Sequence, residues 1–196
     1  MNNAGVARGK TILDSTQKDI ELTFNVNTLS HYWLAQEFLP NMIKNDHGMI
    51  ITVASLAGYI TPPNLVDFAA SKAAAVAFHE GLGAELLTRY NAPKVRTVLV
   101  TQGHTDTSLF KGFKSEQDFL APMLRPETVA EAILTKAFTG TSGHVILPGM
   151  GNLITSVRAL PNWAQATLRA KSQDLMLGFK GRQVSTMKKL AILIDL

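Results

Sequence analysis

Hydrophobic positions along the chain alternate between a helical period and short continuous runs. A stripe of large apolar residues near the 3.6-residue period predicts a long helix over residues 15–44. Its members are Ile20, Phe24, Leu29, Trp33, Leu34 and Phe38. A segment crowded with small residues predicts a second long helix over 67–90, and Pro126 followed by Glu127 marks the start of a third.

Three apolar, partly β-branched runs lie between these helices and are typical of buried strands. They cover residues 49–54, 94–101 and 144–147. Strands that alternate with helices favour a parallel sheet covered by helices on both faces. We therefore expect an α/β fold, with one domain over residues 1–150 and an amphipathic tail over residues 151–196.

Local signals refine the region around the second long helix. Pro62 and Pro63 cannot continue a helix or a strand interior, so residues 59–66 are expected to form a loop. Asp67 is expected to cap the helix that follows. Gly81, inside that helix, lacks the strand–turn–helix context of a phosphate-binding loop and is interpreted as a close-packing position.

Composition narrows the class of protein without indicating a chemistry. The chain has 196 residues, 46% of them hydrophobic, a net charge of +4 and no cysteine. This balance suits a single soluble domain and excludes disulfides and cysteine-ligated metals, so no metal site is predicted. Basic residues are spread along the chain, which argues against nucleic-acid binding. Because no run of about eighteen apolar residues occurs, no membrane span is expected.

Ser55, Phe68 and Lys72 are the strongest candidates for a functional site. Ser55 follows the strand predicted at 49–54, and Phe68 and Lys72 stand four residues apart on one face of the next helix. A hydroxyl and an amine would then meet near the carboxyl end of a strand. A serine at a strand end and a lysine in the first turns of a helix are also common in proteins without catalysis, so this pattern alone leaves both interpretations open.

The spacing of these three residues resembles the catalytic pattern of the short-chain dehydrogenase/reductase family. In that family a serine precedes a Tyr-x-x-x-Lys motif by thirteen residues, and here the tyrosine position holds Phe68. The resemblance implies that Ser55 binds the substrate oxygen and that Lys72 holds the nicotinamide ribose. Phe68 has no proton to transfer, and general acid–base catalysis contributes about 10²- to 10⁴-fold, so slow turnover is expected.

Two segments near the start of the chain match the family in the same order. The motif Asn-Asn-Ala-Gly, which lies beside the cofactor in the family, is present here and assigns Asn3, Ala4 and Gly5 to cofactor binding. The segment FNVN resembles one whose last asparagine kinks a helix and holds a water in a proton relay to the lysine. That resemblance places Asn27 in the catalytic set.

A third matching segment follows the strand predicted at 94–101. It resembles the Pro-Gly-x-x-x-Thr loop that contacts the carboxamide side of the nicotinamide, with Gln102 in place of the proline. The resemblance assigns Gly103, Thr105 and Thr107 to cofactor binding.

For the fold, the resemblance implies a partial doubly wound, Rossmann-like parallel sheet, the C-terminal portion of such a domain. The implied cofactor is NAD or NADP. The family's Thr-Gly-x-x-x-Gly-x-Gly loop, which places the cofactor pyrophosphate at a helix N-terminus, does not occur in this sequence. The nucleotide-binding part is therefore expected to be missing, either from the protein or only from this piece of it.

The phrases NNAGV, FNVN and HGMIITVASLAGY resemble the retinol and hydroxysteroid dehydrogenase branch of the family. This branch implies a lipophilic alcohol or ketone as substrate, such as a retinoid, a steroid or a fatty alcohol. It also implies peripheral association with the cytoplasmic side of the endoplasmic reticulum or with lipid droplets, and otherwise a cytoplasmic protein. The amphipathic tail could lie on such a membrane or pack on the domain.

Small residues in the helix over 67–90 would let another helix approach closely. In the family this helix and the preceding one form a four-helix homodimer interface, although packing within one chain would explain the composition equally well. A non-catalytic interaction or lipid-associated protein, derived from the same family, is the alternative function.

Overall fold

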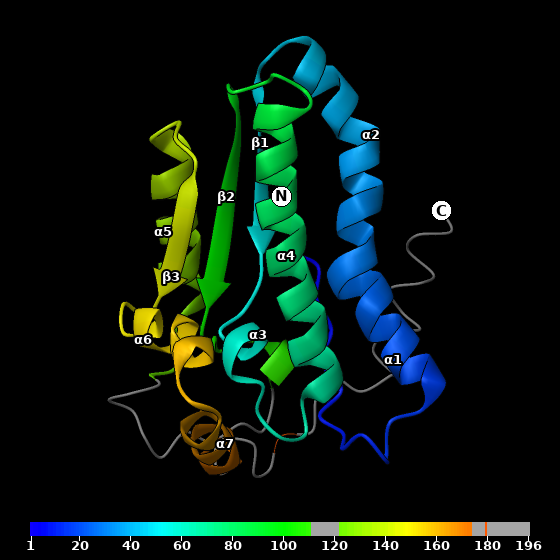
Figure 1. Ribbon diagram of the computed structural model, residues 1–196, viewed down its shortest axis with the longest axis vertical. Helices are drawn as coiled ribbons and strands as arrows, with labels where there is room; N and C mark the ends of the chain where they lie inside the picture. Colours follow the sequence, from blue (N-terminus) through cyan, green and yellow to red (C-terminus); the bar gives the residue numbers. More distant parts are fainter. Residues whose placement is uncertain (111–121, 174–178, 180–196) are drawn as a thin grey trace.

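A three-stranded parallel sheet forms the centre of the computed structural model, which describes residues 1–110, 122–173 and 179. The strands β1 (Gly48–Val53), β2 (Val95–Gln102) and β3 (Gly143–Leu147) lie side by side in the order β1-β2-β3 (Figure 1). In the register, Gly48 pairs with Val95 and Val98 pairs with Gly143. All three expected strands are confirmed, with their ends shifted by about one residue.

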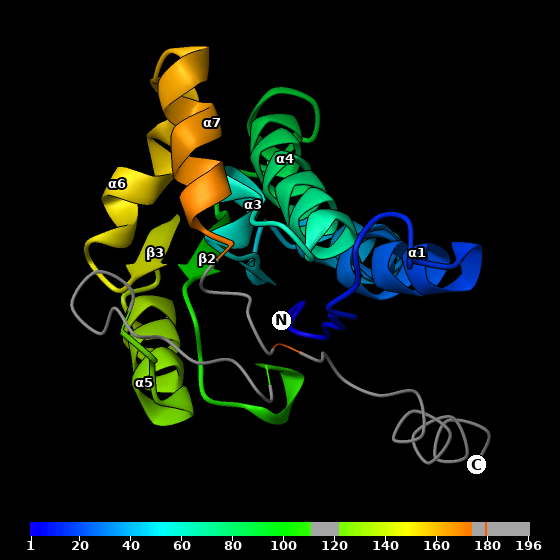
Figure 2. The ribbon, with the colours of Figure 1, turned by 90° about the horizontal axis from the view of Figure 1, so that it is seen from below.

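Helices cover both faces of this sheet. On one face α4 (Val66–Thr88) packs on β1 and β2, with α2 (Ser30–Lys44) beside it, whereas α5 (Pro126–Phe138) packs on β2 and β3 from the other face (Figures 1 and 2). The remaining helical elements are α1 (Gln17–Phe24), η1 (Asn25–Leu29), α3 (Ala57–Ile60), η2 (Ser108–Phe110), α6 (Gly151–Thr155), η3 (Val157–Ala159) and α7 (Asn162–Lys171). This arrangement is the expected α/β fold with a partial doubly wound sheet.

Alternate side chains of β1 enter two different hydrophobic clusters. Ile50 belongs to the cluster between the sheet and the pair α2 and α4, with Leu39, Phe78 and Leu82 among its members. Val53 belongs to the cluster under α5. A strand buried on both faces explains why its sequence is continuously apolar rather than alternating.

The beginning of the chain extends the sheet beyond β1. The Asn2 amide donates to the Ile51 carbonyl at 2.7 Å, and the Val53 amide donates to the Asn2 carbonyl at 3.0 Å. Asn2 thereby forms a parallel bridge with Thr52. The residues that follow Asn2 are placed at the carboxyl end of the strands, where open α/β sheets bind ligands.

The long helix expected over residues 15–44 is present but divided. Thr16, rather than Ser15, caps its first turn, because the Thr16 hydroxyl accepts the Asp19 amide and the Asp19 carboxylate accepts the Thr16 amide. A π-helical turn then separates α1 from α2 at Asn25–Leu29. Such a turn inserts one extra residue and bends the helix, and it often marks a functional position.

Three details around α4 differ from the sequence expectations. Asp67 does not cap the helix: it lies inside α4, and its carboxylate accepts the Thr23 hydroxyl at 2.8 Å. Gly81 is not a close-packing position within the chain, because a Cβ there would meet nothing within 4 Å. The stretch 59–66 is not entirely a loop, since Tyr59 and Ile60 complete the short helix α3.

The segment after β3 packs on α3. The Arg158 guanidinium donates to the Gly58 carbonyl at 2.6 Å, and that of Arg169 donates to the Ile60 carbonyl at 3.0 Å. The part of the expected tail up to Gln173 therefore packs on the domain, and residues 174–178 and 180–196 lie outside the described residues. Of the helices in the described ranges, none combines the length and the apolar character that a membrane crossing requires.

Asp19→Asn is expected to lower the free energy of unfolding by about 3 kcal/mol, because Asp19 pairs with the buried Arg8 at 2.7 Å and with Lys10 at 2.6 Å. The Lys10 hydrogen bond holds the pKa of the Asp19 carboxyl far below its usual range. A carboxyl with a depressed pKa stabilises the fold above its unfolded pKa and loses that contribution as the pH falls.

Urea unfolding over a pH series measures both effects, with the exposed Asp14→Asn as control. The gap between wild type and Asp19→Asn should narrow below about pH 4. A gap that stays constant from neutral pH into acid, or equal losses for the two variants, would contradict the assignment.

Candidate active site

A cavity of about 320 Å³ opens at the carboxyl ends of β1 and β2. Its lining comes from the chain start, the end of β1, the first turns of α4 and the loop after β2. Eight of the residues expected from the sequence line it: Asn3, Ala4, Gly5, Ser55, Phe68, Lys72, Gly103 and Thr107. The structure therefore brings together groups that are up to about a hundred residues apart in the sequence, and leaves Asn27 and Thr105 behind the lining.

Lys72 presents a buried amine to this cavity. The residue is 4% exposed, and its Nζ donates a hydrogen bond to the Val53 carbonyl at 2.7 Å. Burial disfavours the charged ammonium and lowers the pKa of Lys72 to about 8. The amine is thus fixed in position at the end of β1 and is more easily deprotonated than an ordinary lysine.

Ser55 lies across from the helix, just beyond the end of β1. Its Oγ accepts the Ala57 amide at 3.2 Å and donates to the Gln102 carbonyl at 3.4 Å. The second bond is long for an O–H···O hydrogen bond, whose usual length is about 2.7–2.8 Å. The hydroxyl can therefore turn to donate to an oxygen bound in the cavity.

Asn27 supports the cavity from behind. In the π-helical turn its Oδ1 accepts the Val6 amide at 2.8 Å, and its Nδ2 donates to the Val6 carbonyl and to the Ser71 hydroxyl, both at 2.9 Å. Asn27 is completely buried. Its side chain joins the chain start to α4, next to Lys72, while the water relay that the family resemblance assigns to it stays a prediction.

Phe68 closes one side of the cavity as an apolar wall. Its side chain is 2% exposed and packs with Ala7, Leu65 and Phe179. The ring meets that of Phe110 edge to face, with centroids 5.8 Å apart, and its own centroid lies 5.9 Å from Lys72 Nζ. The side chain at this position offers no group that could exchange a proton.

Tyr59 does not supply a phenol to the cavity. It packs against Ala54, Val76 and Leu99 on the α4 face of the sheet, with its hydroxyl in hydrogen-bonding range of Thr101. Burial raises the pKa of Tyr59.

The loop after β2 is held by backbone contacts. The Gly103 amide donates to the Leu147 carbonyl at 2.7 Å, and a Cβ at Gly103 would come within 3.3 Å of Pro148. A larger residue at position 103 would push this loop away from the end of β3. Thr105 bridges to Leu124, and its hydroxyl donates to the Gly103 carbonyl at 3.3 Å, so it supports the loop instead of lining the cavity.

Sequence reasoning missed two polar residues beside the site. The Ser71 hydroxyl accepts a hydrogen bond from the Asn27 side-chain amide and donates one to the Phe68 carbonyl at 2.7 Å. His31 is 1% exposed, and neither ring nitrogen hydrogen-bonds to a described residue. Burial, with the nearby Lys72 charge, lowers the pKa of His31 to about 4. Their positions in the sequence could have pointed to them, because His31 lies four residues after Asn27 and Ser71 directly precedes Lys72.

Sequence comparisons show which known proteins this chain resembles. A family model described as short chain dehydrogenase matches residues 1–118. The chain is 55% identical over 100 residues to dehydrogenase RED2 of Cochliobolus heterostrophus, covering 51% of this chain and 38% of the relative. It is 35% identical over 183 residues to human estradiol 17-beta-dehydrogenase 11, covering 92% of this chain and 60% of that enzyme. The chain thus spans between about a third and two thirds of the length of these two relatives.

Solved structures show the same fold. A short chain dehydrogenase from Burkholderia cenocepacia, in complex with NADP, superposes with a TM-score of 0.64 at 26% identity over 84% of this chain and 66% of that chain. A short-chain dehydrogenase from Streptomyces avermitilis gives a TM-score of 0.66 at 20% identity, over 85% of this chain and 65% of that chain, which is a likeness in fold.

Asn27→Ala is expected to lower the free energy of unfolding by about 2–3 kcal/mol, because it leaves the Val6 backbone groups and the Ser71 hydroxyl without their partner in a buried site. Denaturant unfolding measures the loss. Asn25→Ala is the matched control, since Asn25 is exposed in the same π-helical turn. Equal losses for the two variants would show that the Asn27 side chain does not hold the chain start in place.

Proposed function

The chain belongs to the short chain dehydrogenase family, and on that premise we propose that it forms the substrate and nicotinamide side of an NAD(P)-dependent oxidoreductase acting on an alcohol or ketone. The observation that carries the proposal is the cavity at the carboxyl ends of β1 and β2. Ser55 and Lys72 line this cavity together with the backbone of the chain start and of the loop after β2. Ligands of open α/β sheets bind at this edge.

The residues around the cavity fit the nicotinamide end of such a cofactor. Lys72 offers ammonium donors, Thr107 offers a hydroxyl, and Gly5 and Gly103 keep two backbone segments close to the space. A bound nicotinamide would supply hydride transfer. The residues that would hold it are Lys72, the segment from Asn3 to Gly5 and the loop from Gly103 to Thr107. The Gly-rich segment that binds a pyrophosphate does not occur in this sequence.

In this scheme the chain's own groups have separate tasks. Ser55 donates its Oγ hydrogen to the substrate oxygen, exchanging its long bond to the Gln102 carbonyl. Lys72, fixed by the Val53 carbonyl, would donate to the nicotinamide ribose. Phe68 cannot take the proton that an alcohol loses on oxidation or give the proton that a ketone oxygen gains on reduction, so the reaction proceeds slowly unless water carries the proton.

A lipophilic substrate is proposed for two reasons. Phe68, Leu109 and Phe110 give the cavity an apolar wall. The similarity to estradiol 17-beta-dehydrogenase 11 indicates a steroid or another hydrophobic alcohol or ketone.

Lipid association is proposed for the surface formed by α6 and α7. Leu153 and Trp163 are 70% and 75% exposed on these helices, which lie together at one end of the molecule (Figure 2). Residues 151–171 contain no acidic residue, and Lys171 adds a positive charge beside Arg158 and Arg169, whose guanidinium groups also donate to α3 carbonyls. An apolar surface with positive charge suits an anionic membrane or lipid-droplet surface, facing the cytoplasm.

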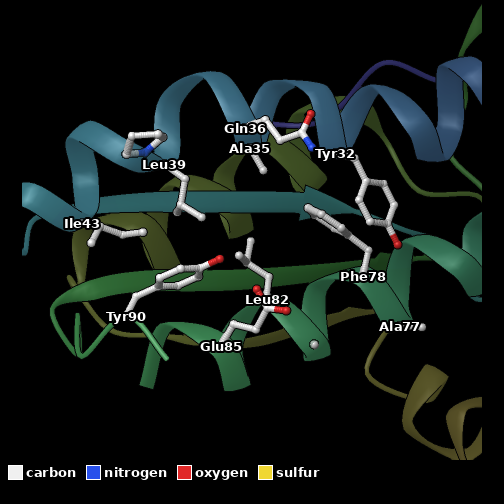
Figure 3. Close-up of a pocket in the computed structure, with 12 residues that line it drawn as sticks. Tyr32, Ala35, Gln36, Leu39, Ile43, Ala77, Phe78, Leu82, Glu85 and Tyr90 are labelled. Atoms are coloured by element: carbon white, nitrogen blue, oxygen red, sulfur yellow. The ribbon is translucent and has the colours of Figure 1, made fainter. Parts of the chain in front are cut away.

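A homodimer is proposed for the face formed by α2 and α4. Side chains from the two helices line a groove of about 640 Å³ (Figure 3). Tyr32 and Phe38 are 46% and 57% exposed on α2, and Gly81 on α4 leaves open space beside the groove. A second copy of the same two helices would cover these apolar groups and fill that space.

The second candidate function is a non-catalytic interaction or lipid-associated protein. Phe68 favours it, because a phenylalanine at the tyrosine position removes the family's proton donor. The dimer face and the surface of α6 and α7 would then carry the function, and the cavity would not turn over substrate.

Phe68→Tyr tests the oxidoreductase proposal. The phenol would enter the cavity beside Lys72 and restore proton transfer, so estradiol oxidation with NAD or NADP should rise by about 10²-fold or more, measured as reduced-nucleotide absorbance. Phe110→Tyr is the matched control, because it adds a phenol to the same cavity from another element. A gain no greater than that of the control would count against catalysis and favour the second function.

Ala77→Glu tests the dimer. Ala77 is exposed on the groove, and a carboxylate facing its symmetry mate would cost several kcal/mol. Light scattering should report twice the chain mass of 21.3 kDa for the wild type and the chain mass for the variant. Leu134→Glu, on the opposite face of the sheet in α5, should leave the dimer intact. A wild-type monomer would refute the proposal.

A further inference from the structure

The Lys72 amine faces a cavity that offers its positive charge no partner. Among the described residues lining the cavity there is no aspartate and no glutamate. The hydrogen bond from Lys72 Nζ ends on the Val53 carbonyl, a neutral acceptor. In a family member with a tyrosine at position 68 a phenolate would be the natural counter-charge, and Phe68 removes it.

The amine is also largely shielded from bulk solvent. Lys72 is 4% exposed, and the Phe68 ring centroid lies 5.9 Å from Nζ. Phe110 and Leu109 extend the apolar wall. Burial without a counter-charge favours the neutral amine, in agreement with the lowered pKa of about 8. At neutral pH the uncharged fraction is on the order of a hundredfold larger than for an ordinary lysine.

The neutral form of a buried lysine amine is a nucleophile towards carbonyl carbon. We propose that Lys72 forms an imine with lipophilic aldehydes in this cavity, in a reaction that needs no nucleotide. The proposal rests on the cavity alone and does not depend on the oxidoreductase function.

The step is balanced without an oxidant or a reductant. The Nζ lone pair adds to the aldehyde carbon, and a proton moves from nitrogen to the former carbonyl oxygen to give a carbinolamine. The C–O bond then breaks, water leaves with the second amine proton, and a C=N bond to Lys72 remains. Addition of water reverses the reaction, so the product is a reversible aldehyde adduct.

Ser55 is placed to assist both halves of this step. Its Oγ lines the same cavity, and its donated bond to the Gln102 carbonyl is 3.4 Å long. The hydroxyl can donate instead to the aldehyde oxygen as nitrogen attacks, and to the carbinolamine oxygen as water leaves. Ser55 therefore acts as a hydrogen-bond donor to the reacting oxygen.

Reductive trapping tests the proposal. The wild-type protein is incubated with hexanal and sodium cyanoborohydride, which converts an imine to a stable secondary amine, and the modified peptide is identified by mass spectrometry. Lys72 should be alkylated at least about tenfold faster than Lys94, whose side chain is 74% exposed and serves as the internal reference. Lys72 labelled no faster than Lys94 would overturn the proposal.

Two variants separate the cavity reaction from general lysine chemistry. Lys72→Arg retains a donor for the Val53 carbonyl but has no nucleophilic amine, and should lose the fast phase of labelling. Ser55→Ala should slow labelling of Lys72 by about tenfold or more while leaving Lys94 unchanged. Circular dichroism verifies the fold of each variant, and an unaltered Lys72 rate in a folded Ser55→Ala protein would refute the role of Ser55.

The result of the trapping experiment can be distinguished from the result of the Phe68→Tyr turnover experiment. Trapping of Lys72 without any gain of turnover in Phe68→Tyr would support the imine and not the oxidoreductase. A gain of turnover in Phe68→Tyr without trapping in the wild type would support the oxidoreductase and refute the imine.

Discussion

The side-chain hydrogen bonds of Asn27 hold the chain start against α4, and both of these segments line the cavity. Asn27 binds both backbone groups of Val6 and the hydroxyl of Ser71, and the Asn2 bridge to Thr52 holds the same chain start against β1. With these contacts in place, the segment from Asn3 to Gly5 lies beside Lys72 at the sheet edge. Asn27 lies in the π-helical turn, so a local departure from α-helical geometry carries the side chain that joins two of the four segments around the cavity.

Phe68 connects the packing of the cavity with its electrostatics. A phenylalanine here buries well against Leu65 and Phe110, but it removes both a proton donor and a potential counter-charge for Lys72. In the proposed oxidoreductase the first loss would slow the alcohol–ketone conversion, whereas the second leaves the amine in its neutral form for more of the time. A phenylalanine at this position thus works against the proposed hydride chemistry and favours the proposed imine.

The periodicity of the sequence predicted most of the fold, because long amphipathic helices and doubly buried strands have strong patterns. Of the residues that the family resemblance assigned to the site, eight line the cavity, while Asn27 and Thr105 support it from behind. What the sequence could not provide were contacts between distant segments: Asp67 satisfies Thr23 across two helices instead of capping its own, and Arg158 and Arg169 bind carbonyls of α3. Gly81 shows a second limit of sequence reasoning. A small residue in a helix indicates that another element can pack closely there, but the sequence does not say whether that element belongs to the same chain.

The protonation equilibrium of Lys72 is the quantity on which the whole account of the cavity depends. It can be measured directly by a pH titration of the Lys72 side-chain carbon next to Nζ, followed by NMR in protein labelled with ¹³C-lysine and assigned with Lys72→Arg. The account predicts a pKa of about 8, well below that of the other lysines. A pKa near the ordinary value of about 10.4 would show that the amine is solvated or paired with a negative charge, and would contradict the description of Lys72 as a buried amine without a counter-charge.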